Sequence, residues 1–83
     1  MPDPSAVRER VASIVASVTH TRVGPQADAS RETLDEWDSL SHVEILFTVE
    51  EDQGVEFSEN VMNGLDSVDA ITTEVVRLKQ ASS

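Results

Sequence analysis

The sequence predicts an all-α fold, a four-helix bundle with three longer helices, one short helix and a long loop between the first and the second. Three apolar segments have the spacing of a single helical face, and helix start and stop residues bound them. The chain has 83 residues, enough for one modest core. We expect a single domain over residues 1–83, with helices at about 4–19, 39–53, 58–63 and 67–80.

The first helix is predicted from valine and isoleucine residues that recur three or four positions apart. Asp3 and Pro4 form a helix start, because an acidic side chain can cap the first turn and proline is tolerated there. Polar and charged residues fall largely on the opposite side. The apolar face consists of Val7, Val11, Ile14, Val15 and Val18.

Residues 20–36 have no sustained period and contain Gly24-Pro25, so we expect a long loop, which lets the second helix lie antiparallel or oblique to the first. Leu34 and Trp37 are the apolar anchors of this segment. Trp37 is the only tryptophan, and an aromatic side chain is expected to fill a small core rather than to contact a ligand.

The second helix begins at Asp38-Ser39, where either side chain can cap the first turn, and ends before Gly54, which favours a helix stop. A helical projection places five residues in one arc that we expect to face the core: His42, Val43, Ile45, Leu46 and Val49. Leu40 and Phe47 fall on a second face together with acidic residues. This second face is expected to dock on partner proteins; the alternative is that the loop buries Leu40 and that Phe47 lies at the core's edge.

The remaining segments are shorter. Residues 55–57 are predicted as an extended link whose Val55 and Phe57 reach into the core, Ser58 is expected to cap the short helix, and Gly64 to stop it. The last helix starts near Asp66-Ser67. Its apolar face is Val68, Ile71, Val75 and Leu78.

The composition excludes several classes of function. There is no cysteine, so disulfides, thiolate metal sites and cysteine nucleophiles are excluded, and the two distant histidines do not favour a metal site. Six basic residues stand against 16 acidic ones, which argues against nucleic-acid and anionic-membrane partners. No signal peptide or run of about 18 apolar residues is visible. A cytoplasmic monomer is therefore expected.

We expect no catalytic residues, because recognisable catalytic motifs are missing and little chain is left for a concave site. His42 lies one turn after Ser39, so a serine–histidine pair is conceivable as a small hydrolase. A histidine on an apolar arc is more often a hydrogen-bonded core residue, and we favour that interpretation.

Three segments together resemble the acyl carrier protein and peptidyl carrier protein family. They read W-D-S-L-S-H-V-E-I-L, V-E-E-D-Q-G-V-E-F and L-D-S-V-D-A-I, and the likeness covers nearly the whole chain. Glu36 stands where many members have glycine, which departs from the fatty-acid carriers. A second D-S pair, Asp66-Ser67, lacks the leucine and is interpreted as a helix cap only.

The resemblance implies a bundle of the acyl-carrier type and a covalent cofactor, 4′-phosphopantetheine. In the family, a phosphopantetheinyl transferase moves this group from coenzyme A to the serine of the D-S-L motif, using magnesium. Carried over, Ser39 is the attachment site, and Asp38 and Leu40 are its recognition neighbours. The arm's thiol would hold acyl or aminoacyl groups as thioesters. The partner-docking face would comprise Leu40, Glu44, Phe47, Glu50 and Glu51.

The chain is thus expected to be a carrier rather than an enzyme, free-standing, served by a loading enzyme (an acyltransferase or an adenylating ligase) and by a downstream synthase or transferase. Polyketide or nonribosomal biosynthesis is favoured over a fatty-acid or D-alanyl carrier, because the basic residues are mostly arginine and the W-D-S-L variant departs from the usual fatty-acid pattern. The non-carrier alternative is an acidic helical module that binds a basic protein, with Ser39 as a mere cap.

Overall fold

The structure, a computed structural model, describes residues 3–21, 30–32 and 34–81. Within them the chain forms four helices, α1 (Pro4–Thr19), α2 (Ser39–Gln53), α3 (Glu59–Met62) and α4 (Val68–Ala81), and no strand. The all-helical prediction is confirmed for this part of the chain. The bounds of α1 and α2 agree with the predicted ones, and α3 and α4 differ from theirs by one residue at each end.

The helix ends follow from the residues that the sequence places there. Asp3 caps α1 by accepting from the Ser5 backbone N–H at 3.0 Å. Asp38 caps α2, and Gly54 ends it in the left-handed conformation with φ +67°. Only a residue without a Cβ adopts that conformation at little cost.

One predicted cap is wrong. Ser58 precedes α3, but its side chain makes no capping hydrogen bond. Its backbone carbonyl accepts from the N–H groups of Val61 and Met62 instead, so this short helix starts without help from a side chain.

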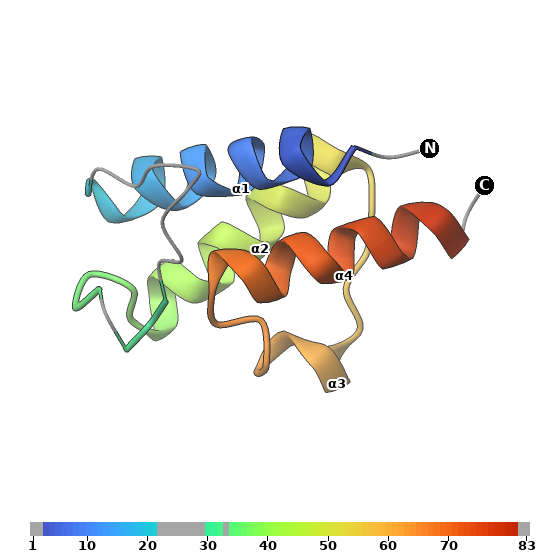
Figure 1. Cartoon of the computed structure of the whole chain (residues 1–83). Helices are drawn as coiled ribbons and strands as arrows, with labels where there is room; N and C mark the ends of the chain where they lie inside the picture. Colours follow the sequence, from blue (N-terminus) through green and yellow to red (C-terminus); the bar gives the residue numbers. More distant parts are fainter. Residues whose placement is uncertain (1–2, 22–29, 33, 82–83) are drawn as a thin grey trace.

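Two of the long helices pack on the third. Figure 1 shows α1 along one side, with α4 crossing in front of an obliquely inclined α2, and α1 contacts both of them. The core lies between them and is completed by Trp37, Phe57 and Leu65 from the connections. Its least exposed helical residues are Val11, Val15, Ile45, Val49, Val68, Ile71 and Val75.

The predicted core face of α2 needs one correction. Four of its five residues are buried, but Val43 is 49 % exposed. Helix α2 packs chiefly on α1, so the core covers only part of its circumference. Val43 lies outside that part, three residues after Leu40 and four before Phe47, which are exposed as well. In the link after α2, Phe57 is 5 % exposed and belongs to the core, and the half-buried Val55 packs against it, as predicted.

The segment before α2 is tied to the start of α4. Ser30 forms an isolated antiparallel bridge with Ser67, and the Arg31 N–H donates to the Asp66 carbonyl at 3.0 Å. Leu34 packs against the core. Gly24-Pro25, predicted as part of the loop, lies outside the described residues.

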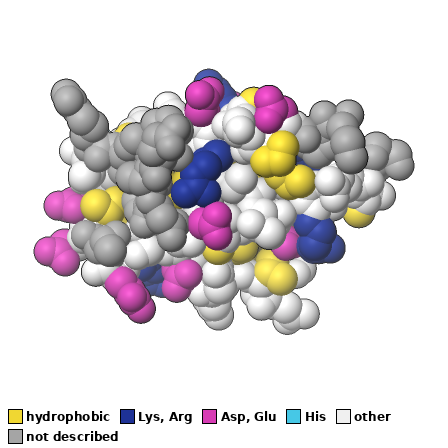
Figure 2. All heavy atoms as spheres, viewed as in Figure 1, with side chains coloured by type: hydrophobic (Ala, Val, Ile, Leu, Met, Phe, Trp, Pro, Cys, Tyr) yellow, Lys and Arg dark blue, Asp and Glu magenta, His cyan; other side chains and the backbone are white. Residues whose placement is uncertain are grey.

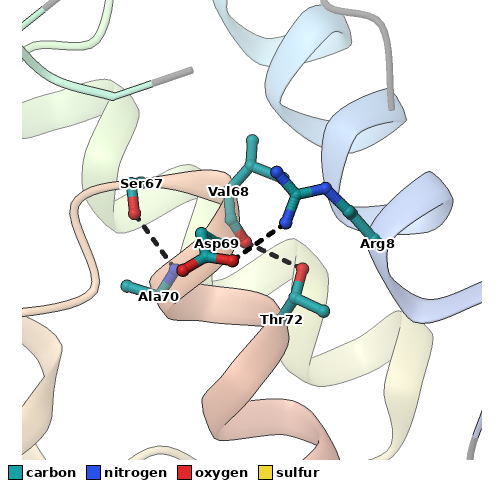
Figure 3. A network of polar contacts seen from close by, with 6 residues as sticks. All are labelled: Arg8, Ser67, Val68, Asp69, Ala70 and Thr72. Atoms are coloured by element: carbon teal, nitrogen blue, oxygen red, sulfur yellow. Dashed lines mark hydrogen bonds and ion pairs between the residues drawn. The ribbon is translucent and has the colours of Figure 1, made fainter. Parts of the chain in front are cut away.

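The start of α4 carries a small polar network (Figure 3). The Ser67 hydroxyl accepts from the Ala70 N–H at 3.0 Å, which makes Ser67 the helix cap that the sequence predicts. Arg8 on α1 donates to Asp69 at 3.0 Å. These contacts fix α4 against α1 and give Ser67 a structural task.

Candidate functional site

Ser39 is the first residue of α2, and its side chain is exposed. The capping task at this helix end falls to the preceding residue: the Asp38 carboxylate accepts from the Ser41 N–H at 2.9 Å, and the Asp38 carbonyl accepts from the His42 N–H at 2.8 Å. The hydroxyl of Ser39 is therefore not required for the cap. It stands at the surface at a helix end where backbone N–H groups favour negative charge.

The electrostatics of this end are set by Asp38. The hydrogen bond from the Ser41 backbone lowers the pKa of Asp38, with smaller contributions from the Ser41 side chain and the Leu40 backbone. The carboxylate is thus ionised at neutral pH and is directed at the first turn of α2. Asp38 and Leu40, the predicted recognition neighbours, flank Ser39 as exposed residues.

Behind Ser39, Trp37 anchors the chain in the core. Trp37 is 2 % exposed and His42 is 6 % exposed. The indole Nε1 of Trp37 donates to His42 Nδ1 at 3.0 Å, and His42 Nε2 lies 2.8 Å from the Met62 carbonyl oxygen. Both expectations for these residues, that Trp37 fills the core and that His42 is hydrogen-bonded inside it, are confirmed.

The same contacts also decide whether His42 could act as a catalytic base for Ser39. A general base must have a ring nitrogen free to take a proton from the hydroxyl. Both nitrogens of His42 are occupied, by Trp37 and by Met62. The structure therefore does not bring an available imidazole to Ser39, although the two residues are one helical turn apart.

The second face of α2 is exposed as the sequence predicts. Leu40 is 80 % exposed and Phe47 is 56 % exposed, so neither the loop nor the core covers them. Glu44 and Glu51 are exposed on the same helix. Val43, between Leu40 and Phe47 in the sequence, is exposed too, so three large apolar side chains follow one another at helical spacing on α2. A continuous exposed apolar row is more informative than single exposed residues, because such patches are common where proteins contact one another.

A groove continues this face toward α3. It has a volume of about 550 Å³ and its apolar floor includes Phe47, Val55 and Met62. Its rim is acidic, and the carboxylates along it are those of Glu50, Glu51, Glu56 and Glu59.

Glu50 has an internal partner as well. Its carboxylate accepts from the Phe57 N–H at 2.7 Å, and the residue is half-buried. It therefore holds the link after α2 in place. This contact was not predicted, because an acidic residue within an acidic run gives no sign of which backbone N–H it accepts from.

Charge is distributed unevenly over the molecule. Figure 2 shows several acidic side chains close together at the lower left of the visible face, with others spread over the rest of it. Three arginines are paired with acids: Arg8 with Asp69, Arg10 with Asp52 and Arg77 with Glu74. Within the described residues, no group of three or more histidine or acidic side chains is arranged to hold a metal ion.

Comparisons with protein-family models, curated proteins and solved structures found no match to this chain. In the part of the chain that the structure describes, no helix combines the length and apolarity needed to cross a bilayer.

Proposed function

We propose that this protein is a carrier that holds biosynthetic intermediates as thioesters on a 4′-phosphopantetheine arm attached to Ser39. The observation that carries the proposal is the exposed Ser39 hydroxyl at the start of α2, relieved of capping by Asp38. Because Ser39 is the first helical residue and Asp38 is the cap, the hydroxyl of Ser39 is left at the surface of the helix end.

The residues around Ser39 fit the group. A phosphodiester on the hydroxyl would lie at the positive end of α2, where N–H groups and the helix dipole favour an anion. In the attachment step the hydroxyl oxygen bonds to the pantetheine-bearing phosphorus of coenzyme A. The pyrophosphate bond breaks, adenosine 3′,5′-bisphosphate leaves and the hydroxyl proton passes to a base of the transferase. The arm supplies the thiol that a chain without cysteine lacks.

The exposed face of α2 suits a shuttle. Leu40 and Phe47 offer apolar anchors, and Glu44 and Glu51 offer charges to basic patches on a phosphopantetheinyl transferase, a loading enzyme or a downstream synthase. Electrostatic docking of this kind gives fast and weak encounters. Tethering keeps the substrate at hand for successive enzymes, because later encounters become intramolecular.

Within this class we favour polyketide or nonribosomal biosynthesis over fatty-acid or D-alanyl transfer, on the sequence features alone. The protein itself would be a cosubstrate without catalytic residues. Loading by an adenylating ligase or by an acyltransferase distinguishes the pathways.

The test is an intact-mass measurement. The purified protein is incubated with coenzyme A, magnesium and a broad-specificity phosphopantetheinyl transferase. We expect the mass of one phosphopantetheinyl group to be added to the wild type and to Ser67→Ala, and none to Ser39→Ala. Ser67→Ala is the matched control, because Ser67 also follows an aspartate and precedes a helix.

The alternative, an unmodified acidic module that docks on a basic protein, is favoured by the same exposed face of α2. It predicts no mass change in the wild type and partner binding that Ser39→Ala leaves intact. Addition to Ser39→Ala would reject the site, and no addition to the folded wild type would reject the carrier function.

A further inference from the structure

His42 uses both of its ring nitrogens inside the protein. Nδ1 accepts from the Trp37 indole at 3.0 Å, and Nε2 contacts the Met62 carbonyl at 2.8 Å. The two rings are tilted by 31°, with their centroids 6.2 Å apart, so they meet through this hydrogen bond rather than by stacking. The imidazole thus connects the Trp37 indole to the Met62 carbonyl, two groups that lie far apart in the sequence.

The two contacts determine where the proton of the ring lies. An indole N–H can only donate, so Nδ1 must accept; a backbone carbonyl can only accept, so Nε2 must donate. This defines the neutral ring with its hydrogen on Nε2. A side chain that cannot accept at one position and donate at the other would leave a buried polar group without a partner, which is costly.

The bridge joins three segments. Trp37 directly precedes Asp38-Ser39, His42 lies one turn into α2, and Met62 is the last residue of α3. Helix α3 has four residues and no side-chain cap, and it is held by the packing of Val61 and Met62 against the core and by the contact of the Met62 carbonyl with His42. Met62 and Phe47 also line the same acidic groove. The imidazole therefore supplies a polar contact that links the end of α3 to α2, in addition to the apolar packing of α3.

We propose that His42 is a positioning residue for the modification of Ser39, acting through Trp37 and Met62 and not by touching the hydroxyl. The inference rests on the proposed carrier function, because the reaction that His42 would serve is transfer of the arm. Holding Trp37 fixes the backbone that presents Ser39, and holding Met62 fixes α3 beside the docking face. A transferase that contacts both the start of α2 and the face beside α3 would then find the two in one fixed relative position.

Four variants test this. His42→Leu removes both hydrogen bonds while filling the space with an apolar side chain. His42→Asn places an oxygen near the position of Nδ1, His42→Gln reaches the position of Nε2, and each can retain one of the two contacts. Trp37→Phe removes the indole N–H. The matched control is Thr72→Val, which removes a buried hydrogen bond to the Val68 carbonyl (Figure 3) on the distant α4.

The first readout is nitrogen-15 NMR of the unmodified protein. In the wild type we expect the hydrogen of His42 on Nε2 and slow solvent exchange of the Trp37 indole N–H. His42→Asn should keep that protection, and His42→Gln and His42→Leu should lose it. A hydrogen on Nδ1 in the wild type would overturn the inference directly.

The second readout is the steady-state kinetics of arm transfer at a temperature where all variants are folded. We expect KM to rise by roughly two- to tenfold in His42→Gln, His42→Asn and Trp37→Phe, as for one hydrogen bond, with kcat nearly unchanged. His42→Leu should show the largest increase. Thr72→Val should lower stability and leave KM as in the wild type.

The outcomes separate the two proposals. If the wild type gains no arm, the carrier function fails, and the positioning role fails with it. If the wild type is modified but KM is unchanged in His42→Leu, or rises equally in Thr72→Val, only the positioning role is rejected.

Discussion

At the scale of single residues, two neighbours have different roles: Asp38 caps α2, and Ser39 is the proposed site of modification. Asp38 takes the hydrogen bond that holds the first turn of α2, and Ser39 keeps an exposed hydroxyl. The sequence allowed either residue to cap, because aspartate and serine are both favoured at that position. The structure decides between them by geometry, since Asp38 occupies the cap position and Ser39 is already helical.

The first prediction concerns Asp38 and pH. Its pKa in the folded protein lies below the ordinary value of 3.8, so the unfolded chain binds the proton more readily. The ionised carboxylate therefore stabilises the fold at pH values above that ordinary pKa, and this stabilisation is lost as the pH falls through it toward the lower folded pKa. The difference in urea midpoint between wild type and Asp38→Ala should be largest near neutral pH and shrink on acidification.

Asp38→Asn is the control for this experiment. Asparagine caps a helix but does not titrate, so its difference from Asp38→Ala should remain nearly constant with pH. A gap between wild type and Asp38→Ala that is the same at about pH 2 as at pH 7 would contradict the assignment of the cap.

Among the residues of the site, the sequence predicted exposure and burial better than contacts. Helical spacing and residue type were enough to place Leu40 and Phe47 outside and His42 inside. The hydrogen bond between Trp37 and His42 was not predicted, because it joins a residue outside the helix to one inside it at no fixed spacing. The same holds for the Glu50 carboxylate, whose partner lies beyond the end of α2.

At the scale of elements, α2 has two faces with different tasks. Ile45 and Val49 are fully buried against the other helices, whereas Phe47 points away from the core. The spacing of apolar residues predicted these two faces, but it did not predict how much of the circumference of α2 is buried. Val43 was misplaced because the width of the buried face of α2 depends on how the other helices pack on it, which the spacing of apolar residues does not report.

The second prediction uses this division. Ile45→Ala should lower the free energy of unfolding by about 2–5 kcal/mol, since it leaves a cavity in the core. Phe47→Ala should change it by less than about 0.5 kcal/mol, as at most exposed positions, yet should weaken arm transfer by raising KM. Urea denaturation and transfer kinetics of the two variants measure both effects.

Leu40→Ala serves as a companion to Phe47→Ala, because its side chain is even more exposed. If Phe47→Ala unfolds the protein as readily as Ile45→Ala, the face is part of the core. If both surface variants are modified like the wild type, this face does not dock on the transferase.

At the scale of the whole molecule, charge is the dominant feature. The formal net charge is −10 at pH 7, and no lysine or arginine lies between Glu32 and Glu74. The ion pairs of Arg10 with Asp52 and Arg8 with Asp69 join α1 to α2 and α4, and the bond from Arg10 lowers the pKa of Asp52. These exposed pairs contribute little to stability. Because 16 acidic residues stand against six lysine and arginine residues, the chain as a whole is strongly acidic.

The third prediction follows from this imbalance. Raising the salt concentration should increase the KM of arm transfer, because charges further apart than about 10 Å are screened at 0.1 M. Glu44→Gln and Glu51→Gln should raise KM at low salt and flatten its salt dependence. Glu9→Gln, an exposed change on α1, is the matched control and should keep the wild-type slope. An identical salt dependence of KM in all variants would show that the transferase does not bind the acidic face of α2.

The proposed carrier function depends most directly on the chemical state of Ser39 in the cell. The deciding measurement is the intact mass of the protein isolated from its native host, followed by fragmentation to locate any added group. We predict one phosphopantetheinyl group on Ser39, with part of the population heavier by an acyl or aminoacyl thioester. A native protein that is unmodified throughout, or that carries its added mass on Ser67 or another residue, would contradict the account.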